Sequence, residues 1–315
     1  MFTRIRVPTP FQIGRVNTYL AGRTIVDPGP DSEEAWAALL DGINAAGLAP
    51  EDIEQVVVTH PHPDHFGLAR RLRKEGARVL ASPQAADIMA EFENRLHYEQ
   101  SYFTSFFERC GLSAESAETV TNLPEAFLPF APEVQTDRRL SSGDRFTVVE
   151  TTLTADPVEG HAPGELVFGY DADGQHRALV GDNVLGNITP NPFLQPPADR
   201  GGERPRVLPA YNDSLRRLRE QSYDRFLPGH GNDVTAPAER IDEILDAHEQ
   251  RTETVRELVD GPVVPVEIMH QLFDDLPLTE QFSGLSEAVG HLDVLEARGE
   301  VTQRPSGDVV VYEPT

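Results

Sequence analysis

The stretch "THPHPDHFG", residues 59–67, places three of the chain's ten histidines within six positions. His60 and His62 are two residues apart, and side chains at i and i+2 of an extended backbone point the same way. Pro61 and Pro63 favour that extended backbone, because a proline pushes the preceding residue out of the helical region. The spacing therefore predicts that both imidazole rings can reach one metal ion.

The histidine-rich stretch lies between a predicted strand and a predicted helix. "QVVVTH" (55–60) is typical of a buried strand, and "FGLARRLRKEG" (66–76) is typical of a helix. Asp64 and His65 begin the turn into that helix and can face a second, neighbouring ligand position. Because residues 16–30 predict two further strands, the alternation of strands and helices favours an α/β layered fold.

Residues 84–130 interrupt this alternation with a helical insertion that is rich in aromatic residues. These rings could form a lid or wall over a substrate pocket, or they could simply pack against the rest of the domain. Both interpretations are open on the sequence alone. The aromatic residues concerned are Phe92, Tyr98, Tyr102, Phe103, Phe106 and Phe107.

Strand patterns return after the insertion, and helices follow them. The proline-rich residues 191–209 predict an irregular loop. Residues 262–315 predict helices and then a hairpin that turns at residues 305–307, which resembles a winged-helix module. We therefore expect a domain over 1–235, a helical connector over 236–261 and a winged-helix-like domain over 262–315.

The charge of the chain is strongly acidic, with 52 acidic and 27 basic residues, a net charge of −25 and Lys74 as the single lysine. The acidic residues are spread along the whole chain, so we favour adaptation to concentrated salt over an acidic surface that repels nucleic acid. At 1 M salt the Debye length is about 3 Å, so such a surface would have little effect on its partners. This composition resembles that of halophilic archaeal proteins.

Cys110, the single cysteine, excludes an intrachain disulfide. Without a signal peptide or an apolar run of about 18 residues, we expect a cytoplasmic protein with no membrane partner.

Three further candidate ligands lie far along the chain, each beside a glycine. They are His161 in "EGHAPGE", Asp182 in "VGDN" and His230 in "LPGHG". Together with the His-x-His-x-Asp-His pattern of residues 60–65, this order of elements resembles the hydrolase branch of the metallo-β-lactamase fold superfamily. The resemblance covers roughly residues 10–235 and implies an αββα sandwich.

The resemblance also implies a binuclear metal site in which two ions share a hydroxide. Ligands of this kind suit zinc, although iron or manganese can occupy similar sets. Asp64 is the ligand that we expect to act in catalysis, and Asp27 matches an acidic residue that supports the site from behind. The implied ligands are His60, His62 and His161 for the first ion, Asp64, His65 and His230 for the second, and Asp182 as the bridge.

The substrate that we expect is a small ester, thioester or lactone, as in the glyoxalase II-like members. Asn183 and Tyr211 are candidates for orienting its carbonyl group, and the alternative is that both are structural loop residues.

Two other functions stay open on the sequence. The C-terminal module could hold RNA for an endoribonuclease. Phosphate binding relies on Lys and Arg, however, and the expected recognition helix carries acidic residues. Packing or formation of a homodimer is the simpler role for this module. A non-catalytic, ligand-sensing regulator that binds DNA is the third possibility, and the complete ligand set speaks against it. The acidic residues of that helix are Glu287, Asp293, Glu296 and Glu300.

Overall fold

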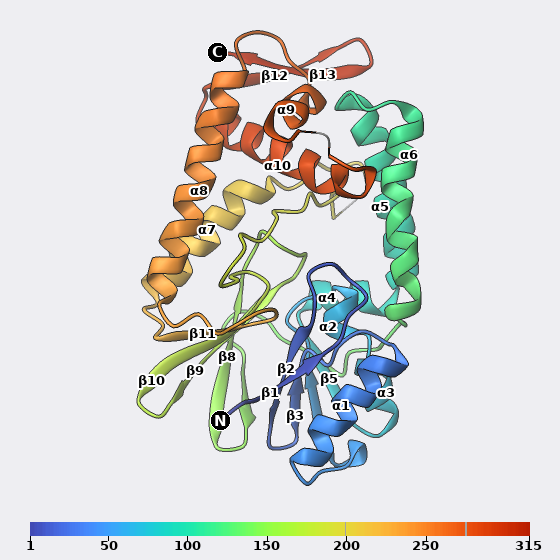
Figure 1. Cartoon of the computed structure of the whole chain (residues 1–315), viewed down its shortest axis with the longest axis vertical. Coiled ribbons are helices and arrows are strands. Elements are labelled where there is room, and N and C mark those ends of the chain that lie inside the picture. Colours follow the sequence, from blue (N-terminus) through green and yellow to red (C-terminus); the bar gives the residue numbers. More distant parts are fainter. Residues whose placement is uncertain (199, 275) are drawn as a thin grey trace. The chain divides into compact units, whose positions relative to one another are not determined.

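The computed structural model describes residues 1–198, 200–274 and 276–315 and divides them into two compact units (Figure 1). The units interleave along the chain, whereas the sequence predicted consecutive domains. Most of the helical insertion shares a unit with the C-terminal segment. The first unit comprises Met1–Glu93, Phe127–Pro190 and Arg217–Ile241, and the second comprises Asn94–Ala126, Asn191–Arg216 and Asp242–Thr315.

Two β-sheets form the centre of the first unit. Six strands lie in the order β1-β2-β3-β4-β5-β6, and five lie in the order β11-β10-β9-β8-β7. The first sheet consists of β1 (Thr3–Val7), β2 (Val16–Ala21), β3 (Thr24–Val26), β4 (Gln55–Val57), β5 (Arg78–Ala81) and β6 (Arg138–Arg139). The second consists of β7 (Arg145–Val148), β8 (Thr151–Pro157), β9 (Leu166–Ala172), β10 (Gln175–Gly181) and β11 (Arg225–Pro228).

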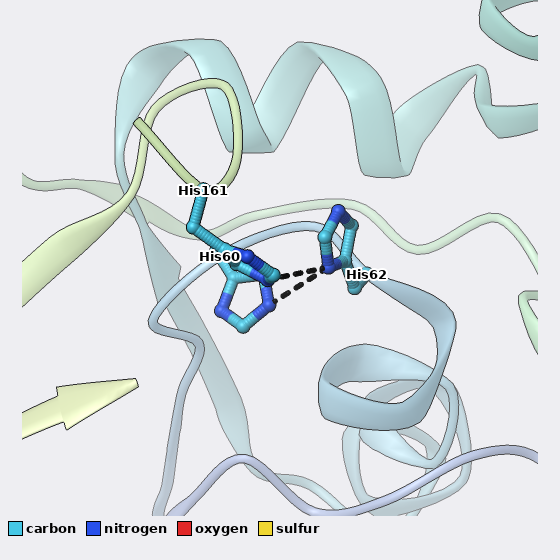
Figure 2. Close-up of side chains that lie close together, drawn as sticks. All are labelled: His60, His62 and His161. Carbon is cyan, nitrogen blue, oxygen red and sulfur yellow. Dashed lines mark hydrogen bonds between the residues drawn. The ribbon is translucent and has the colours of Figure 1, made fainter. Parts of the chain in front are cut away.

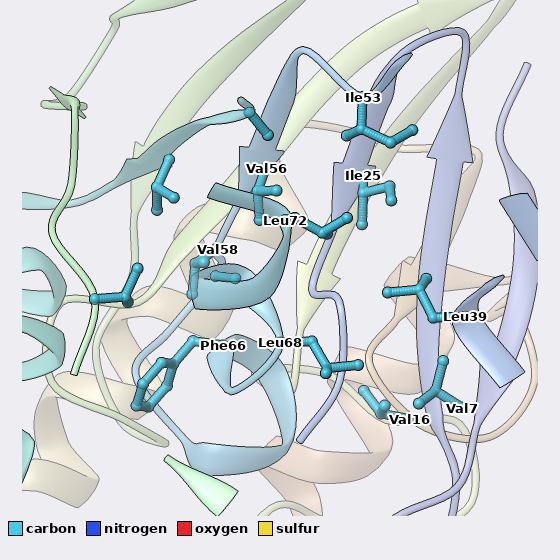
Figure 3. Packing of buried hydrophobic residues seen from close by; sticks show 14 of the residues in the cluster. Val7, Val16, Ile25, Leu39, Ile53, Val56, Val58, Phe66, Leu68 and Leu72 are labelled. Atoms are coloured by element: carbon cyan, nitrogen blue, oxygen red, sulfur yellow. The ribbon is translucent and has the colours of Figure 1, made fainter. Parts of the chain in front are cut away.

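Alternating side chains of the first sheet enter two different hydrophobic cores. Val57 of β4 packs between the sheets, in one cluster with Phe168 of β9. Its neighbours Val56 and Val58 face the other way and pack in a cluster with Leu39, which belongs to a helix (Figure 3). Because side chains alternate along a strand, an uninterrupted run of valines serves both faces. This layered packing confirms the predicted α/β class.

The helices of the first unit are short except for α1. The expected helix over 66–76 is broken, because the Leu68 N–H donates to the Gly29 carbonyl (2.8 Å) and leaves the helical pattern. The bounds are α1 (Glu33–Ala45), η1 (Pro50–Asp52), α2 (Pro63–Phe66), α3 (Ala69–Lys74) and α4 (Pro83–Ala90); η2 (Leu123–Phe130) is shared with the second unit.

The second unit is helical and has its own core. Phe103 and Phe107 of the insertion are buried there with Leu285 and Leu292, which favours packing as the role of those two rings. The hairpin turns at Gly307, with a φ of +63°, and its last pair is Ser306 with Val309, slightly later than expected. The bounds are α5 (Phe92–Arg109), α6 (Ala114–Asn122), α7 (Val207–Glu220), α8 (Pro237–Leu258), α9 (Pro265–Leu272), α10 (Leu278–Ala297), β12 (Val301–Ser306) and β13 (Val309–Pro314); one end each of α5, α7 and α8 belongs to the first unit.

The polar residues singled out from the sequence follow the carboxyl ends of several strands. Asp27 follows β3, His60 follows β4, Asp182 follows β10 and His230 follows β11. β3 and β4 are parallel, as are β10 and β11, so in each sheet these ends lie at one edge. No helix in the described part of the chain is long and apolar enough to cross a membrane.

Candidate metal centre

Three histidines converge at the carboxyl end of β4. His62 Nδ1 lies 3.1 Å from His60 Nε2 and 3.1 Å from His161 Nε2 (Figure 2). His62 has the extended backbone that Pro63 predicts, with φ −80° and ψ 144°. The three nitrogens form a group that could hold a metal ion.

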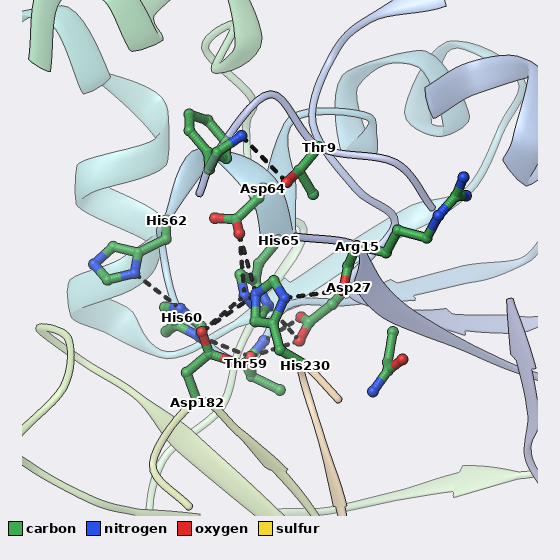
Figure 4. Close-up of polar contacts among 12 residues, drawn as sticks. Thr9, Arg15, Asp27, Thr59, His60, His62, Asp64, His65, Asp182 and His230 are labelled. Carbon is green, nitrogen blue, oxygen red and sulfur yellow. Dashed lines mark hydrogen bonds and ion pairs between the residues drawn. The ribbon is translucent and has the colours of Figure 1, made fainter. Parts of the chain in front are cut away.

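Two further groups that could hold a metal ion lie beside the first: His60, His65 and Asp182, and Asp64, His65 and His230. Asp64 Oδ2 is 3.2 Å from His230 Nε2. Asp182 Oδ2 is 3.4 Å from that nitrogen, 3.5 Å from His65 Nε2 and 3.7 Å from His161 Nε2. Asp182 therefore lies near histidines of all three groups, and Figure 4 shows its carboxylate with His65 and His230.

The outward nitrogens of two histidines are held by hydrogen bonds. His65 Nδ1 lies 2.9 Å from Asp27 Oδ2, and the same carboxylate accepts from the N–H and hydroxyl of Thr59 at 2.8 and 2.7 Å. Asp27 has a φ of +52°, a left-handed conformation that costs energy for residues other than glycine. His230 Nδ1 lies 3.0 Å from the Arg15 carbonyl. With Nδ1 as the donor in both rings, each Nε2 is left as an acceptor.

Glu165 is a further residue of the centre that we did not predict. Its side chain is fully buried. It accepts from the Asp182 N–H at 3.2 Å and from Asn183 Nδ2 at 3.0 Å, and lies 3.9 Å from His60 Nδ1. Burial raises the pKa of Glu165 to about 8. An acid directly before a buried strand, four residues after His161, was the signal available in the sequence.

The electrostatics divide the histidines into two kinds. Burial lowers the pKa of His62 to about 3, with a further decrease from His161. Burial also lowers the pKa of His60 well below its ordinary value. Burial acts in the same direction on His65, but Asp182 and the other nearby carboxylates outweigh it and raise the pKa of that ring. The first two rings are thus neutral, the form that ligates metals.

The residues present fit a divalent metal ion. His65 Nε2, His230 Nε2 and Asp182 Oδ1 are buried without a hydrogen-bond partner among the described residues, and such atoms are costly unless a ligand satisfies them. A Cβ at Gly229 would collide with Asp182 Oδ1, so glycine leaves room for the carboxylate. Imidazole and carboxylate ligands without thiolate suit zinc, iron or manganese.

Asn183 and Tyr211, the candidates for orienting a carbonyl, are both fully buried. The Asn183 amide donates to Glu165, beside the metal centre. Tyr211 belongs to the second unit, where its ring centroid lies 5.5 Å from that of His248. These surroundings favour structural roles, and contact with a substrate stays a prediction for both residues.

Comparisons with known proteins identify the family of the chain. The model of the metallo-beta-lactamase superfamily matches residues 13–230. The chain is similar to the probable metallo-hydrolase YqjP of Bacillus subtilis (strain 168), at 31% identity over 98% of this chain and 96% of the relative. A solved β-lactamase domain protein from Burkholderia ambifaria is 26% identical, with a TM-score of 0.82 over 99% of this chain and 92% of that one. A metallo-β-lactamase family protein from Thermus thermophilus shares the fold, with 24% identity and a TM-score of 0.78 over 100% of this chain and 98% of that one.

The chain therefore belongs to the metallo-β-lactamase superfamily, which confirms the predicted fold. The family and the cluster of buried His and Asp side chains together support an enzyme, a metallo-hydrolase that uses a divalent metal.

Proposed function

We propose that this enzyme binds two divalent metal ions, zinc first among them, and hydrolyses a small ester, thioester or lactone. One observation carries the proposal: seven side chains from distant segments converge in overlapping groups that share the region around Asp182. A single ion would need only one of these groups.

Each residue of the centre would either hold a metal ion or orient a residue that holds one. His60, His62 and His161 would hold one ion, Asp64, His65 and His230 would hold the other, and Asp182 would contact both. When bound, such ions supply Lewis acidity and lower the pKa of a bound water to about 7. Asp27 fixes the ring of His65, and Glu165 fixes the backbone of Asp182. Asp64 remains our candidate for a direct part in catalysis.

The second unit supports a small substrate over RNA. Nearly every residue of α10 from Gly284 to Leu295 is buried, so this helix has little free surface with which to enter a groove of nucleic acid. Several arginines of the unit already pair with carboxylates of the same unit and would have to leave them to bind phosphate. These pairs are Arg204–Asp293, Arg206–Glu296, Arg298–Glu249 and Arg304–Glu313.

The test combines metal analysis with a substrate screen in high salt. The protein as purified would be analysed for zinc, iron and manganese, and then assayed with thioesters, lactones, bis(p-nitrophenyl) phosphate and single-stranded RNA. We expect about two ions per chain and hydrolysis of a thioester or lactone. Efficient cleavage of RNA with every thioester and lactone untouched would replace this proposal with an endoribonuclease.

Adaptation to concentrated salt is a separate proposal that rests on the net charge of −25. We expect the thermal midpoint to rise between low salt and molar potassium chloride, because salt screens the repulsion between carboxylates. A midpoint that stays constant or falls would contradict it. A cytoplasmic location and a homodimer likewise stay predictions.

A further inference from the structure

A group of three phenylalanine rings in the first unit is partly exposed. The ring centroid of Phe11 lies 4.9 Å from that of Phe127 and 5.8 Å from that of Phe130, with the rings edge to face. Phe127 is 39% exposed, and Ile13, in the same loop as Phe11, is 40% exposed. Single exposed apolar residues are ordinary, but several in contact indicate a binding surface.

The loop that carries Phe11 is tied to the metal centre. The Arg15 carbonyl accepts from His230 (Figure 4). Val16 also forms an isolated β-bridge with His230. The loop is closed by its own hydrogen bonds: the Thr9 hydroxyl donates to the Gly14 carbonyl at 2.6 Å, and the Gly14 N–H donates to the Phe11 carbonyl. Phe11 is therefore held in a fixed turn that ends beside a predicted ligand.

The segment that carries the other two rings is tied to the backbone that follows His65. The Phe130 carbonyl accepts from the Asp31 N–H at 2.9 Å. A Cβ at Gly67 would collide with the Phe130 oxygen, so the two backbones are in close contact. Gly67 comes two residues after His65. The three rings thus join two segments that are each anchored next to the Asp64, His65 and His230 group.

We propose that Phe11, Phe127 and Phe130 bind the apolar acyl part of the substrate, so that the enzyme prefers thioesters of acyl groups longer than acetyl. The inference rests on the proposed function and names its substrate class. Binding sites for small molecules commonly combine an apolar wall with a few polar groups. Here the polar groups would act on the carbonyl, and the rings would cover the hydrocarbon that follows it.

The first test is a series of S-acyl-N-acetylcysteamine thioesters, from acetyl to octanoyl, with the metal-loaded enzyme. Each methylene that leaves water contributes about a fourfold gain, so we expect kcat/KM to rise with chain length. Phe11→Ala should flatten this rise with chain length, and Phe11→Leu should restore most of it. Val149→Ala is the matched control, because Val149 is 64% exposed and lies against Gly22, away from the ends of the strands that carry the ligands.

The second test measures binding without turnover, by calorimetric titration of alkyl hydroxamates of increasing length into the same metal-loaded variants. We expect the affinity for the hydroxamate to rise with its chain length in the wild type and in Val149→Ala. In Phe11→Ala the affinity should not depend on chain length. If no thioester is cleaved but the affinity shows this pattern, the three rings bind the hydrocarbon as proposed and the proposed reaction is wrong. If thioesters are cleaved with no dependence on length, or equally by Phe11→Ala, the reaction stands and this inference is overturned.

Discussion

Both units of the molecule bury histidines, but they surround them differently. In the first unit the rings crowd one another: the centroids of His60 and His65 are 4.0 Å apart. In the second unit the centroids of His248 and His291 are 6.4 Å apart. Neither of these two residues belongs to a group that could hold a metal ion in the described part of the chain.

The partners of the second pair are of another kind. His248 Nδ1 lies 2.7 Å from Asn212 Oδ1, and His291 Nδ1 lies 2.8 Å from Thr252 Oγ1. Each ring has a neutral partner at Nδ1, and His291 Nε2 also lies 3.3 Å from Glu287 Oε2. The comparison teaches that burial of a histidine, even beside one carboxylate, does not define a metal site; the convergence of several imidazole nitrogens on two aspartates does.

The largest effect is expected where a converging ring is removed. His62→Ala should abolish turnover and lower the metal content, because His62 Nδ1 lies 3.1 Å from both other nitrogens of its group. His248→Gln, the matched change in the second unit, should keep full metal content. Metal analysis and the thioester assay would check both variants. An active, fully loaded His62→Ala protein would show that convergence alone does not identify the metal centre.

A buried ion pair provides the second prediction. Arg204 binds Asp293 through two hydrogen bonds of 2.7 and 2.6 Å, and the side chains are only 12% and 2% exposed. Asp293→Ala leaves a buried guanidinium unpaired and should destabilise the protein by about 3–5 kcal/mol.

The control for this change is Asp213→Ala, which removes an exposed pair with Arg216 and should alter stability by less than about 1 kcal/mol. Urea unfolding would measure both variants, followed by metal analysis of the folded protein. Loss of metal from folded Asp293→Ala would contradict a purely stabilising role for the polar groups of the second unit.

The sequence predicted the first unit better than the second for a physical reason. Several candidate ligands follow strand ends, and Pro63 predicts the extended backbone that His62 has. The full ligand set and the fold were expected from the resemblance of these motifs to the metallo-β-lactamase superfamily. Glu165 was missed because one acid before a strand has no distinctive spacing. The interleaved units were missed because the shared core of Phe103 and Leu285 joins helices far apart in the chain, and helical periodicity shows which face is apolar but not what it packs against.

Glu165 provides a prediction of intermediate size. Glu165→Gln keeps an oxygen for the Asp182 N–H but places an amide nitrogen where Asn183 now donates. Because Asp182 is the proposed bridge, metal affinity should fall about 10- to 100-fold, as when other outer partners of ligands are changed. Competition with a chelator would measure it. An unchanged affinity would mean that the Asp182 backbone is held without this carboxylate.

The smallest predicted effect is a pH dependence of stability that belongs to His248. Burial lowers the pKa of this ring to about 4, with Glu287 opposing the shift and His291 and Arg251 adding to it. In the unfolded chain the pKa of histidine is about 6.5, so between pH 6.5 and 4 the unfolded state binds the extra proton. The stabilising effect of the neutral ring is therefore complete above about pH 6.5 and is lost progressively as the pH falls toward 4.

Between pH 7.5 and 5.5 this loss amounts to about 1.4 kcal/mol, since one pKa unit corresponds to about 1.36 kcal/mol. Other groups titrate over the same interval, including those of the metal centre, so the quantity to measure is a difference. The free energy of unfolding in urea would be determined for the wild type and for His248→Gln at both pH values. Groups outside the second unit's histidine pair contribute equally to both proteins and cancel. We expect the wild type to lose about 1.4 kcal/mol more than the variant, and an equal loss in the two proteins would show that His248 is not held neutral in the folded state.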